Sequence, residues 1–572
     1  MDTGYIGMIN DLEDSLVKQV NGSQMMNHTK EISKFIRVSS TDDEVESLKY
    51  IADQLEEYGY STKMSFFDGF ISIPVRSSVE LIYPEKIAFD SISHPFSAST
   101  HITGLEAEIV NKLCPGVKGK AVLLKGLPVA DDVLNLQKEG AVAVIYAQDE
   151  NLHNGPVSSI WGSPIENTEN LLVKIPVVSI KRDDGILLEK MIEASRARVR
   201  IECDVDTGWK SIPMLEAEIK SQYSDKYILF SSHIDSWEYG AMDNGSANAT
   251  TIEVARLMAT QEDLLLRGLK VVFWAGHSQG KFFGSAWYAD NNWEELTDNC
   301  LGHVYVDSTG GKDAVIITEA PVMPQTKKLA AEIINKQTGE EFVGKRIGHF
   351  ADQSFFGVGL TSIFGTFSEQ DALLNSNVLS FKTGGPGGKA GGLGWWWHTI
   401  HDTYDKVDEQ LLVRDTKIYT ATVWRLLTYP VLPYDFCDLV DEIENTALKL
   451  QDDLKDRIDL SSLIERIQIL KDKVNSFFNK LEGINVPGKE SDEINEKLRL
   501  LSINLVRITF VNKDCFNFDL SGPIFPLPSL TRGIELSKIN VGTHRYNILK
   551  TEFIRGLNRT MYYLRNAINV LD

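Results

Sequence analysis

Continuous apolar runs in the middle of the chain constrain its fold more than any other feature. Residues 227–230 and 269–274 form two such runs, and a helical pattern over about 247–260 lies between them. Strands that are apolar at successive positions are buried on both faces, which is typical of parallel strands joined by helices. The sequence therefore predicts an α/β domain with a mixed, mostly parallel sheet that helices cover on both sides.

A β-rich segment interrupts this pattern between about residues 75 and 215. It contains one helical pattern at about 129–139, and its apolar strands are expected at 121–124, 141–146 and 175–180. Short strands separated by turns in this way indicate a unit of their own. We therefore predict an inserted β-rich domain over 76–214, so that the α/β domain consists of 1–75 and 215–435.

The last part of the chain, from about residue 436, has a helical pattern throughout. One predicted helix carries its apolar stripe on Ile443, Ala447, Leu450, Leu454 and Ile458. Such a stripe is the mark of a helix with one buried face. We predict a separate all-α domain over 436–572.

Charge and composition exclude several classes of partner. The chain has 572 residues, with 58 Lys and Arg against 80 Asp and Glu, for a net charge of −22. Such a surface repels polyphosphate and anionic lipid, so we expect neither nucleic acid nor a membrane as partner. No stretch approaches the ~20 apolar residues that cross a bilayer, the first residues lack the pattern of a signal peptide, and the 5 cysteines show no CxxC spacing. The predicted location is the cytoplasm.

Side chains that can bind metals follow several of the predicted strands. Open parallel sheets build their sites at this edge. Each side chain has an ordinary explanation when it stands alone, such as a buried histidine at His233 or a helix cap at Asp243. A carboxylate such as that of Asp243 can also bridge two cations, as in sites that hold a pair of metals. In chain order, the candidate residues are His233, Asp235, Asp243, Asp307, His398 and His401.

Taken together, these segments resemble the co-catalytic zinc aminopeptidases and carboxypeptidases, a superfamily that includes glutamate carboxypeptidase, the transferrin receptor and glutaminyl cyclase. The inserted region is similar to a protease-associated domain. The helical tail stands where the glutamate carboxypeptidase and transferrin receptor branch keeps its dimerisation domain. The resemblance is carried by His233-x-Asp235, Gly240-x-x-Asp243-Asn244-x-Ser246, Gly284-Ser285, Asp307 and His398-Thr399-x-x-Asp402-Thr403.

The resemblance implies two divalent metal ions, with zinc as the first choice, and a homodimer that pairs through the C-terminal helical domain. One metal would be held by His233, Asp243 and Asp307. Asp243 would bridge to a second metal completed by His398, and Asp235 would orient His233. The family also has two consecutive glutamates, a general base followed by a metal ligand.

The chain departs from the family at these glutamates, because it reads His277-Ser278-Gln279 where they are expected. The segment up to Gly284 is one residue longer, so counting from either end gives a different alignment. Serine and glutamine cannot accept a proton near neutral pH, whereas His277 could be the base or a ligand of the second metal. We favour the ligand role, beside Asp243 and His398, because it preserves the coordination number. The base is then open among His401, Glu238 and the metal hydroxide.

Two further residues are predicted to contact the substrate. Asp352 opens a segment that resembles the family's loop-and-strand element beside the specificity pocket, although a helix cap would also explain it. Trp397 belongs to a run of three tryptophans that cannot all face one core, so one or two should border the cleft. Packing between domains is the other explanation of these rings.

These observations leave three hypotheses. The first is a metal-dependent hydrolase that cleaves an amide bond, in a small peptide or an N-acyl amino acid, with metal-activated water. The second is a divergent metalloenzyme of the same fold that acts on a non-peptide C–N bond or cyclises its substrate. The third is a non-catalytic binding protein like the transferrin receptor. The sequence alone leaves open the substrate, the native metal and the role of His277.

Overall fold

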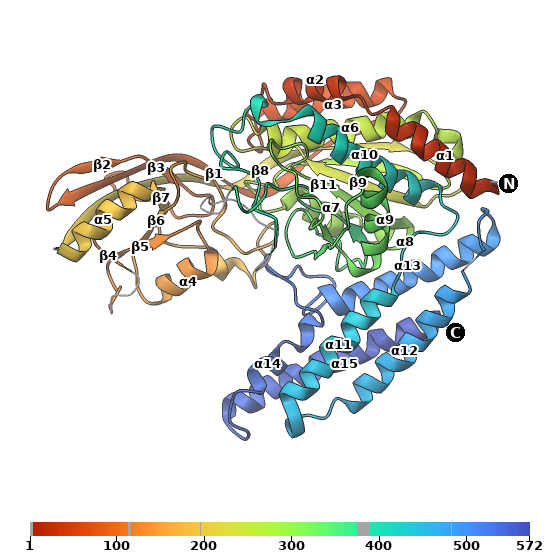
Figure 1. The fold of residues 1–572 in the computed structure, drawn as a ribbon. Coiled ribbons are helices and arrows are strands. Elements are labelled where there is room, and N and C mark those ends of the chain that lie inside the picture. The colour runs from red at the N-terminus through yellow and green to blue at the C-terminus, as the bar shows by residue number, and fades with distance from the viewer. Residues whose placement is uncertain (1–3, 112–115, 195, 375–387, 482) are drawn as a thin grey trace.

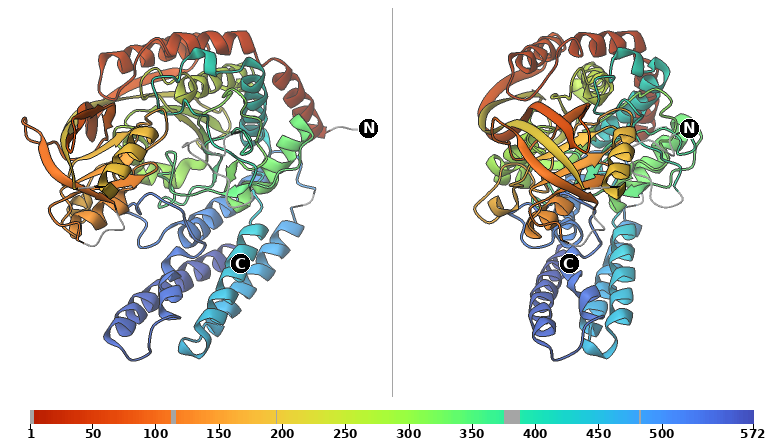
Figure 2. Two further views of the ribbon diagram at one scale, coloured as in Figure 1. Left: turned by 60° about the vertical axis from the view of Figure 1, so that its left-hand side comes forward. Right: turned by 90° about the vertical axis from the view of Figure 1, so that its left-hand side faces the viewer.

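The computed structural model describes residues 4–111, 116–194, 196–374, 388–481 and 483–572. An α/β domain occupies the centre, the insert extends from one side of it, and the C-terminal helices form a bundle that projects below (Figures 1 and 2). In the described ranges, no helix is both long and apolar enough to span a bilayer.

The sheet of the α/β domain is mixed and mostly parallel, as predicted. β9, β10, β11 and β14 run parallel to one another, whereas β8 is antiparallel to β10 and β12 is antiparallel to β14. In spatial order the strands are β13 (Lys345–Arg346), β12 (Pro321–Val322), β14 (Ser362–Ile363), β11 (Cys300–Val306), β9 (Tyr227–His233), β10 (Gly268–Trp274) and β8 (Ala197–Ile219).

Helices cover both faces of this sheet, which explains the continuous apolar strands. In β9, Ile228 and Phe230 pack into one core, and Tyr227 and Leu229 pack into another. The first core is closed by α3 (Asp42–Glu57), α6 (Ala247–Ala259) and α10 (Glu409–Thr428), and the second by α7 (Phe283–Asn291) and α8 (Trp293–Asn299). Successive residues of a strand point to opposite faces, so both must be apolar.

Two long strands join the α/β domain to the insert. β1 (Ser61–Tyr83) pairs with β8 over nearly its full length, from Ser61 opposite Glu218 to Tyr83 opposite Arg198. The predicted boundaries at 75/76 and 214/215 fall inside these strands. One end of each strand packs in the α/β core, through Ile71 and Ile212, and the other end packs in the core of the insert.

The strands of the insert continue the same sheet beyond β8, which pairs with β4, and the insert has two α-helices among the described residues. β4 to β7 are parallel neighbours, and β3 is antiparallel to β7. Its elements are β2 (Ile87–Phe89), β3 (Ser91–Ser93), β4 (Leu105–Asn111), β5 (Ala121–Lys125), α4 (Ala130–Lys138), β6 (Ala143–Ala147), β7 (Val177–Ile180) and α5 (Arg182–Ala194).

The remaining elements are helical. The N-terminal helices α1 and α2 were not predicted, and α2 packs against the segment that carries Asp243. The stripe predicted near Ile443 is buried, although its helix ends at Leu454 and leaves Ile458 outside. The bounds are α1 (Gly4–Lys18), α2 (Gly22–Ile32), α9 (Lys327–Thr338), α11 (Cys437–Leu454), α12 (Ser461–Asn479), α13 (Lys489–Phe510), α14 (Arg532–Leu536) and α15 (His544–Val570).

Candidate metal centre

Three candidate residues meet at the carboxyl ends of three neighbouring parallel strands. His233 is the last residue of β9, Asp307 directly follows β11, and His277 follows β10. The strands are in register, so their ends reach the same edge of the sheet. Among the described residues, one group of candidate ligand atoms lies within 4.8 Å of one another, and it consists of His233, His277 and Asp307.

Asp243 links this group to His398. It lies in the segment Ala241–Ser246 between β9 and α6, where its own backbone is not helical (φ −115°, ψ 88°). Its Oδ1 is 3.1 Å from Nε2 of His233, and its Oδ2 is 3.0 Å from Nε2 of His398. Asp307 Oδ2 is 4.0 Å from Nε2 of His233. The two oxygens of Asp243 thus face two imidazoles, as a bridging carboxylate would.

The three histidines all use Nδ1 for a second partner. Nδ1 of His233 lies 3.0 Å from the backbone carbonyl of Asp235, and Nδ1 of His398 lies 2.8 Å from that of Asn154. Nδ1 of His277 lies 2.6 Å from Oδ2 of Asp352. A carbonyl oxygen only accepts, so Nδ1 of His233 and of His398 carries a proton, and Nε2 is the nitrogen that is left to face Asp243. Metal-binding imidazoles are held in this way.

The donor set fits a divalent metal. Nε2 of His233 is buried and makes no hydrogen bond with any described atom, although Asp243 Oδ1 lies 3.1 Å away. A nitrogen lone pair facing a carboxylate oxygen at that distance is unfavourable unless a cation or a proton lies between them. Mixed imidazole and carboxylate ligands are typical of zinc and of related transition metals.

The charges around the centre also favour a bound cation. Burial alone would lower the pKa of His233, but the carboxylates of Asp243 and Asp307 outweigh it and raise the pKa to about 10. Burial raises the pKa of Asp307, and the neighbouring Asp243 raises it further. The cluster thus has excess negative potential, which a metal ion would neutralise.

A cavity of about 280 Å³ opens beside these residues, between the α/β domain and the insert. Asp243, His277, Asp307 and His398 line it from the α/β domain, and Leu127, Pro128, His153, Asn154, Gly155 and Pro156 line it from the insert.

Comparisons with known proteins place this arrangement in a family. Residues 215–423, which include every strand end described above, match the profile of peptidase family M28. The α/β domain belongs to this family. It is thereby part of the co-catalytic zinc exopeptidase superfamily that the sequence motifs resemble.

The M28 domain has named relatives and solved neighbours. Carboxypeptidase Q of Xenopus laevis is 34% identical over 241 residues, which cover 37% of this chain and 49% of that protein. The probable glutamate carboxypeptidase VP8 of Zea mays is 25% identical over 226 residues, which cover 37% of this chain and 30% of that protein. This chain therefore spans half or less of these two curated relatives. The structure of BSAP, a zinc aminopeptidase from Bacillus subtilis, shares the fold at a TM-score of 0.54 and 19% identity, over 72% of this chain and 96% of that chain.

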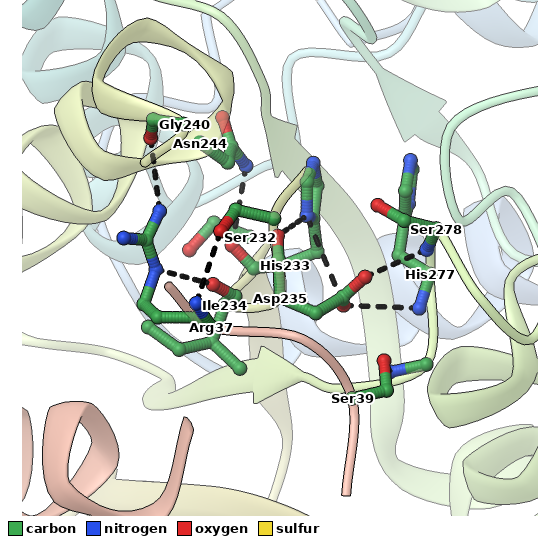
Figure 3. Close-up of polar contacts among 12 residues, drawn as sticks. Arg37, Ser39, Ser232, His233, Ile234, Asp235, Gly240, Asn244, His277 and Ser278 are labelled. Atoms are coloured by element: carbon green, nitrogen blue, oxygen red, sulfur yellow. Dashed lines mark hydrogen bonds and ion pairs between the residues drawn. The ribbon is translucent and has the colours of Figure 1, made fainter. Parts of the chain in front are cut away.

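Asp235 contacts the residues of the centre through two different groups, its backbone carbonyl and its side-chain carboxylate. Its backbone carbonyl holds His233, whereas its carboxylate oxygen Oδ1 is 3.9 Å from the same ring nitrogen. The carboxylate instead accepts hydrogen bonds from the backbone N–H of His277 at 3.0 Å and of Ser278 at 2.7 Å (Figure 3). Asp235 thus connects the ends of β9 and β10.

Asp352 lies behind His277 and not against the substrate, which corrects the predicted role. Its side chain is fully buried, and it does not line the cavity. Besides His277, it accepts hydrogen bonds from Ser285 Oγ at 2.6 Å and from the Tyr305 hydroxyl at 2.8 Å. Burial would raise the pKa of Asp352, but the facing His277 lowers it below its usual value. Asp352 is therefore a positioning residue.

His277 stands on the His233 side of the centre. The two rings are stacked with centroids 3.8 Å apart and an angle of 7° between their planes. The predicted set of Asp243, His277 and His398 does not form a group within 4.8 Å among the described residues, because His277 groups with His233 and Asp307 instead. The predicted second metal would therefore have fewer protein ligands than expected.

The structure places the two other side chains named as candidates for the base, His401 and Glu238, outside the cavity lining. His401 is exposed and its ring lies against Trp395, with centroids 5.3 Å apart. Glu238 is partly exposed, and neither residue lines the cavity. Trp397 does line the cavity, and its ring stacks on His398 at 3.6 Å.

Sequence reasoning missed three residues that hold the centre in place. The buried guanidinium of Arg37 donates to the backbone carbonyls of Ile234 and Gly240, at the two ends of the loop after β9 (Figure 3). Asp402 was quoted for its motif only, yet both its oxygens accept from the backbone N–H groups of residues 242 and 243. Asn154 orients His398 from the insert. Arg37 and Asn154 carry no local sequence signal, since their partners lie far along the chain.

Proposed function

We propose that this protein is a metal-dependent hydrolase that cleaves the amide bond of a small peptide or an N-acyl amino acid with metal-activated water. The observation that carries the proposal is the convergence of His233, Asp243, Asp307 and His398 on one another, at the wall of a cavity that Asp243, Asp307 and His398 line. The M28 match and the carboxypeptidase names of the relatives support the same reaction class.

The metal ligands proposed for this chain are imidazoles and carboxylates. His233, Asp243 and Asp307 would hold one zinc ion, and Asp243 with His398 would hold a second and weaker one. Ser278 lines the cavity in the segment where the family has its two glutamates, and a serine offers no carboxylate, which is the reason for the weaker position. When bound, the metal supplies Lewis acidity, which polarises the amide carbonyl and lowers the pKa of water.

His277 is the proposed proton acceptor. It lines the cavity, and its Nδ1 faces the buried carboxylate of Asp352, which leaves Nε2 for the reacting water. A carboxylate in this position fixes the orientation of the ring and stabilises the imidazolium that forms. The proton would then pass from Nε2 to the leaving amine. The His277–Asp352 pair replaces the glutamate base of the family.

The same pair favours a second candidate function. A histidine base in place of a glutamate, together with a serine in place of a ligand, is a change of catalytic machinery rather than a loss of it. A divergent M28 enzyme that acts on a non-peptide C–N bond, or that cyclises its substrate, would have this pattern. The retained metal ligands argue against a purely non-catalytic binding protein.

The proposed function is tested with zinc-loaded, full-length protein and a panel of dipeptides and N-acyl amino acids. Hydrolysis would be followed by mass spectrometry of the products, with His233→Ala as the inactive control. Cleavage by the wild-type protein alone is the expected result. A protein that binds zinc but cleaves no member of the panel would overturn the peptidase assignment and favour the second candidate.

We also propose that the insert is a protease-associated domain and that two chains pair through the C-terminal helices. Several apolar side chains on these helices are exposed, namely Leu448, Ile469, Ile548, Ile554 and Tyr562. Light scattering after size-exclusion chromatography should give twice the mass of one chain. A monomer at micromolar concentration would contradict the pairing. The cytoplasmic location stays a prediction from the sequence.

A further inference from the structure

Lys281 lines the cavity on the side of His277 and Ser278. It lies in the segment that is one residue longer than the family pattern, and both Lys281 and Phe282 have left-handed backbone conformations, with φ of 52° and 66°. Non-glycine residues adopt such conformations rarely, and mostly where the surrounding structure holds them. Here the backbone N–H of Gly162, from the insert, donates to the carbonyl of Lys281 at 2.7 Å.

The ammonium group of Lys281 has no ionic partner in the part of the chain that the structure describes. Its Nζ makes no hydrogen bond or ion pair there, and it lies 5.0 Å from the centre of the Phe282 ring. Burial lowers the pKa of Lys281 to about 8, and no carboxylate opposes that shift. A cation that is partly removed from water without a counter-ion gains free energy when an anion binds beside it.

The rest of the cavity shows which anion would fit. Its two carboxylates, Asp243 and Asp307, face His233 at the metal centre, so they do not form an ion pair with Lys281. Its other walls are largely apolar and include Leu127, Pro128, Phe282, Phe350, Leu393 and Trp397. The cavity thus offers a cation next to apolar walls, beside a metal centre suited to an amide carbonyl. A carboxylate next to an apolar side chain complements this arrangement.

We propose that Lys281 binds a carboxylate of the substrate, so that the enzyme prefers N-acyl amino acids and dipeptides with a free carboxylate over neutral ones. This inference rests on the proposed function, because it assigns the substrate class of the same cavity. The carboxylate could be the α-carboxylate of the substrate or that of an acidic side chain. In both cases its negative charge would pair with Nζ, and the amide bond would lie toward His277.

The first test compares three substrates that differ in their carboxylate. N-acetyl-L-phenylalanine carries an α-carboxylate, N-acetyl-L-glutamic acid α-amide carries only a side-chain carboxylate, and N-acetyl-L-phenylalaninamide carries none. In Lys281→Met, KM should rise about 10- to 100-fold for the substrate whose carboxylate Lys281 binds, as expected for loss of a charged hydrogen bond. For the neutral amide, KM should stay unchanged.

Two further variants serve as controls. Lys281→Arg keeps the charge and should retain most of the preference for a carboxylate. Lys312→Met removes an exposed lysine that does not line the cavity, and it should leave every KM unchanged. Equal KM values for wild type and Lys281→Met on both carboxylate substrates would overturn the assignment, provided that the variant melts at the wild-type temperature.

A binding experiment separates this inference from the proposed function. Calorimetry with full-length, zinc-loaded protein would compare 3-phenylpropanoate with 3-phenylpropanamide. We expect the carboxylate to bind more tightly to wild type, and that preference to disappear in Lys281→Met. This result would support the role of Lys281 even if no substrate were hydrolysed. Hydrolysis without any effect of Lys281→Met, or no preference for the carboxylate in wild type, would overturn the inference and leave the proposed function standing.

Discussion

Oδ2 of Asp352 lies 2.6 Å from Nδ1 of His277, and Asp352 is fully buried behind the ring. The two residues come from different parts of the chain, one after β10 and the other before β14. Their pairing gives His277 a fixed orientation and leaves Nε2 available for the proposed proton transfer. An imidazole supported by a carboxylate can move a proton as a glutamate does, with a reference pKa closer to neutral pH.

Removing the charge of Asp352 should therefore impair catalysis and spare metal binding. In Asp352→Asn, the side-chain amide has only one oxygen that can accept a hydrogen bond from His277. If its NH2 group faces Nδ1 instead, the ring takes the tautomer with its proton on Nε2, which cannot accept a proton there. We expect kcat to fall by at least about 100-fold, the range attributed to a positioned general base. Bound zinc, measured by elemental analysis, should stay at the wild-type level.

Two further variants serve as controls for the Asp352→Asn experiment. Asp298→Asn changes an exposed carboxylate that does not line the cavity and should leave kcat unchanged. His277→Gln distinguishes a base from a ligand, because a base can be lost without loss of metal. If His277→Gln loses one equivalent of zinc, His277 is a ligand and the assignment of the base is wrong.

Zinc should stabilise the folded protein through the centre. Without a cation, the carboxylates of Asp243 and Asp307 share a buried site around His233, and proximity to Asp243 raises the pKa of Asp307. A metal that binds only the folded state at 100 times its Kd adds about 2.7 kcal/mol. We expect the melting temperature to fall with a chelator and to recover with zinc.

The variant His233→Ala should remove most of this response, because it deletes the one imidazole placed between both carboxylates. His101→Ala, which changes an exposed histidine in the insert, should respond to zinc like the wild type. An equal zinc response in wild type and His233→Ala would place the bound metal elsewhere.

The sequence was sufficient to predict which side chains meet at the strand ends but not the residues that hold them there. His233 and Asp307 could be predicted because they end apolar strands, and Asp243 because it opens a helix after the first of these strands. The partners of Arg37 and Asp352 could not be predicted, since their hydrogen bonds join positions far apart in the chain. A hydrogen bond between distant residues leaves no periodic pattern in the sequence.

The domain boundaries were also harder to predict from the sequence than the domains themselves. The apolar strands of each domain were recognised, but the boundaries fall inside β1 and β8, which continue from one core into the other. A change from one core to another within a strand produces no turn signal. The sequence therefore predicted that the two domains exist, but it did not predict the strands that connect them.

Arg37 should be essential for the stability of the loop after β9. Its guanidinium makes five hydrogen bonds, all to backbone carbonyls, and the side chain is fully buried. Arg37→Met would leave these carbonyls without partners, at a cost of about 1–3 kcal/mol for each that stays buried. We expect the free energy of unfolding in urea to fall by at least about 3 kcal/mol, together with zinc affinity.

Arg76→Met is the matched control, since Arg76 is a largely exposed arginine on β1. It should change stability by less than about 0.5 kcal/mol. Arg37→Lys should lie between the two, because one ammonium cannot reach carbonyls on both sides of the loop. A fully stable Arg37→Met variant would show that the loop does not depend on these contacts.

Acid should destabilise the protein in part through His94 of the insert. Its Nδ1 lies 3.1 Å from the carbonyl of Gly155, which lines the cavity, and its Nε2 lies 2.7 Å from Ser179 Oγ. Burial lowers the pKa of His94 to about 4, although the Gly155 carbonyl acts in the opposite direction. In the unfolded chain the pKa is near 6.5, so the unfolded state binds the proton first as the pH falls.

The stability that neutral His94 provides is thus fully present above about pH 6.5 and is lost progressively down to about pH 4, by at most about 3 kcal/mol. Urea unfolding of full-length protein at pH 7, 5.5 and 4.5 would measure this slope. His94→Gln cannot be protonated in this range, so its stability should fall less steeply with acid than that of the wild type. His101→Gln, at an exposed position, should retain the wild-type slope. If His94→Gln also retains it, other buried histidines such as His349, whose pKa burial lowers to about 4, must dominate the acid response.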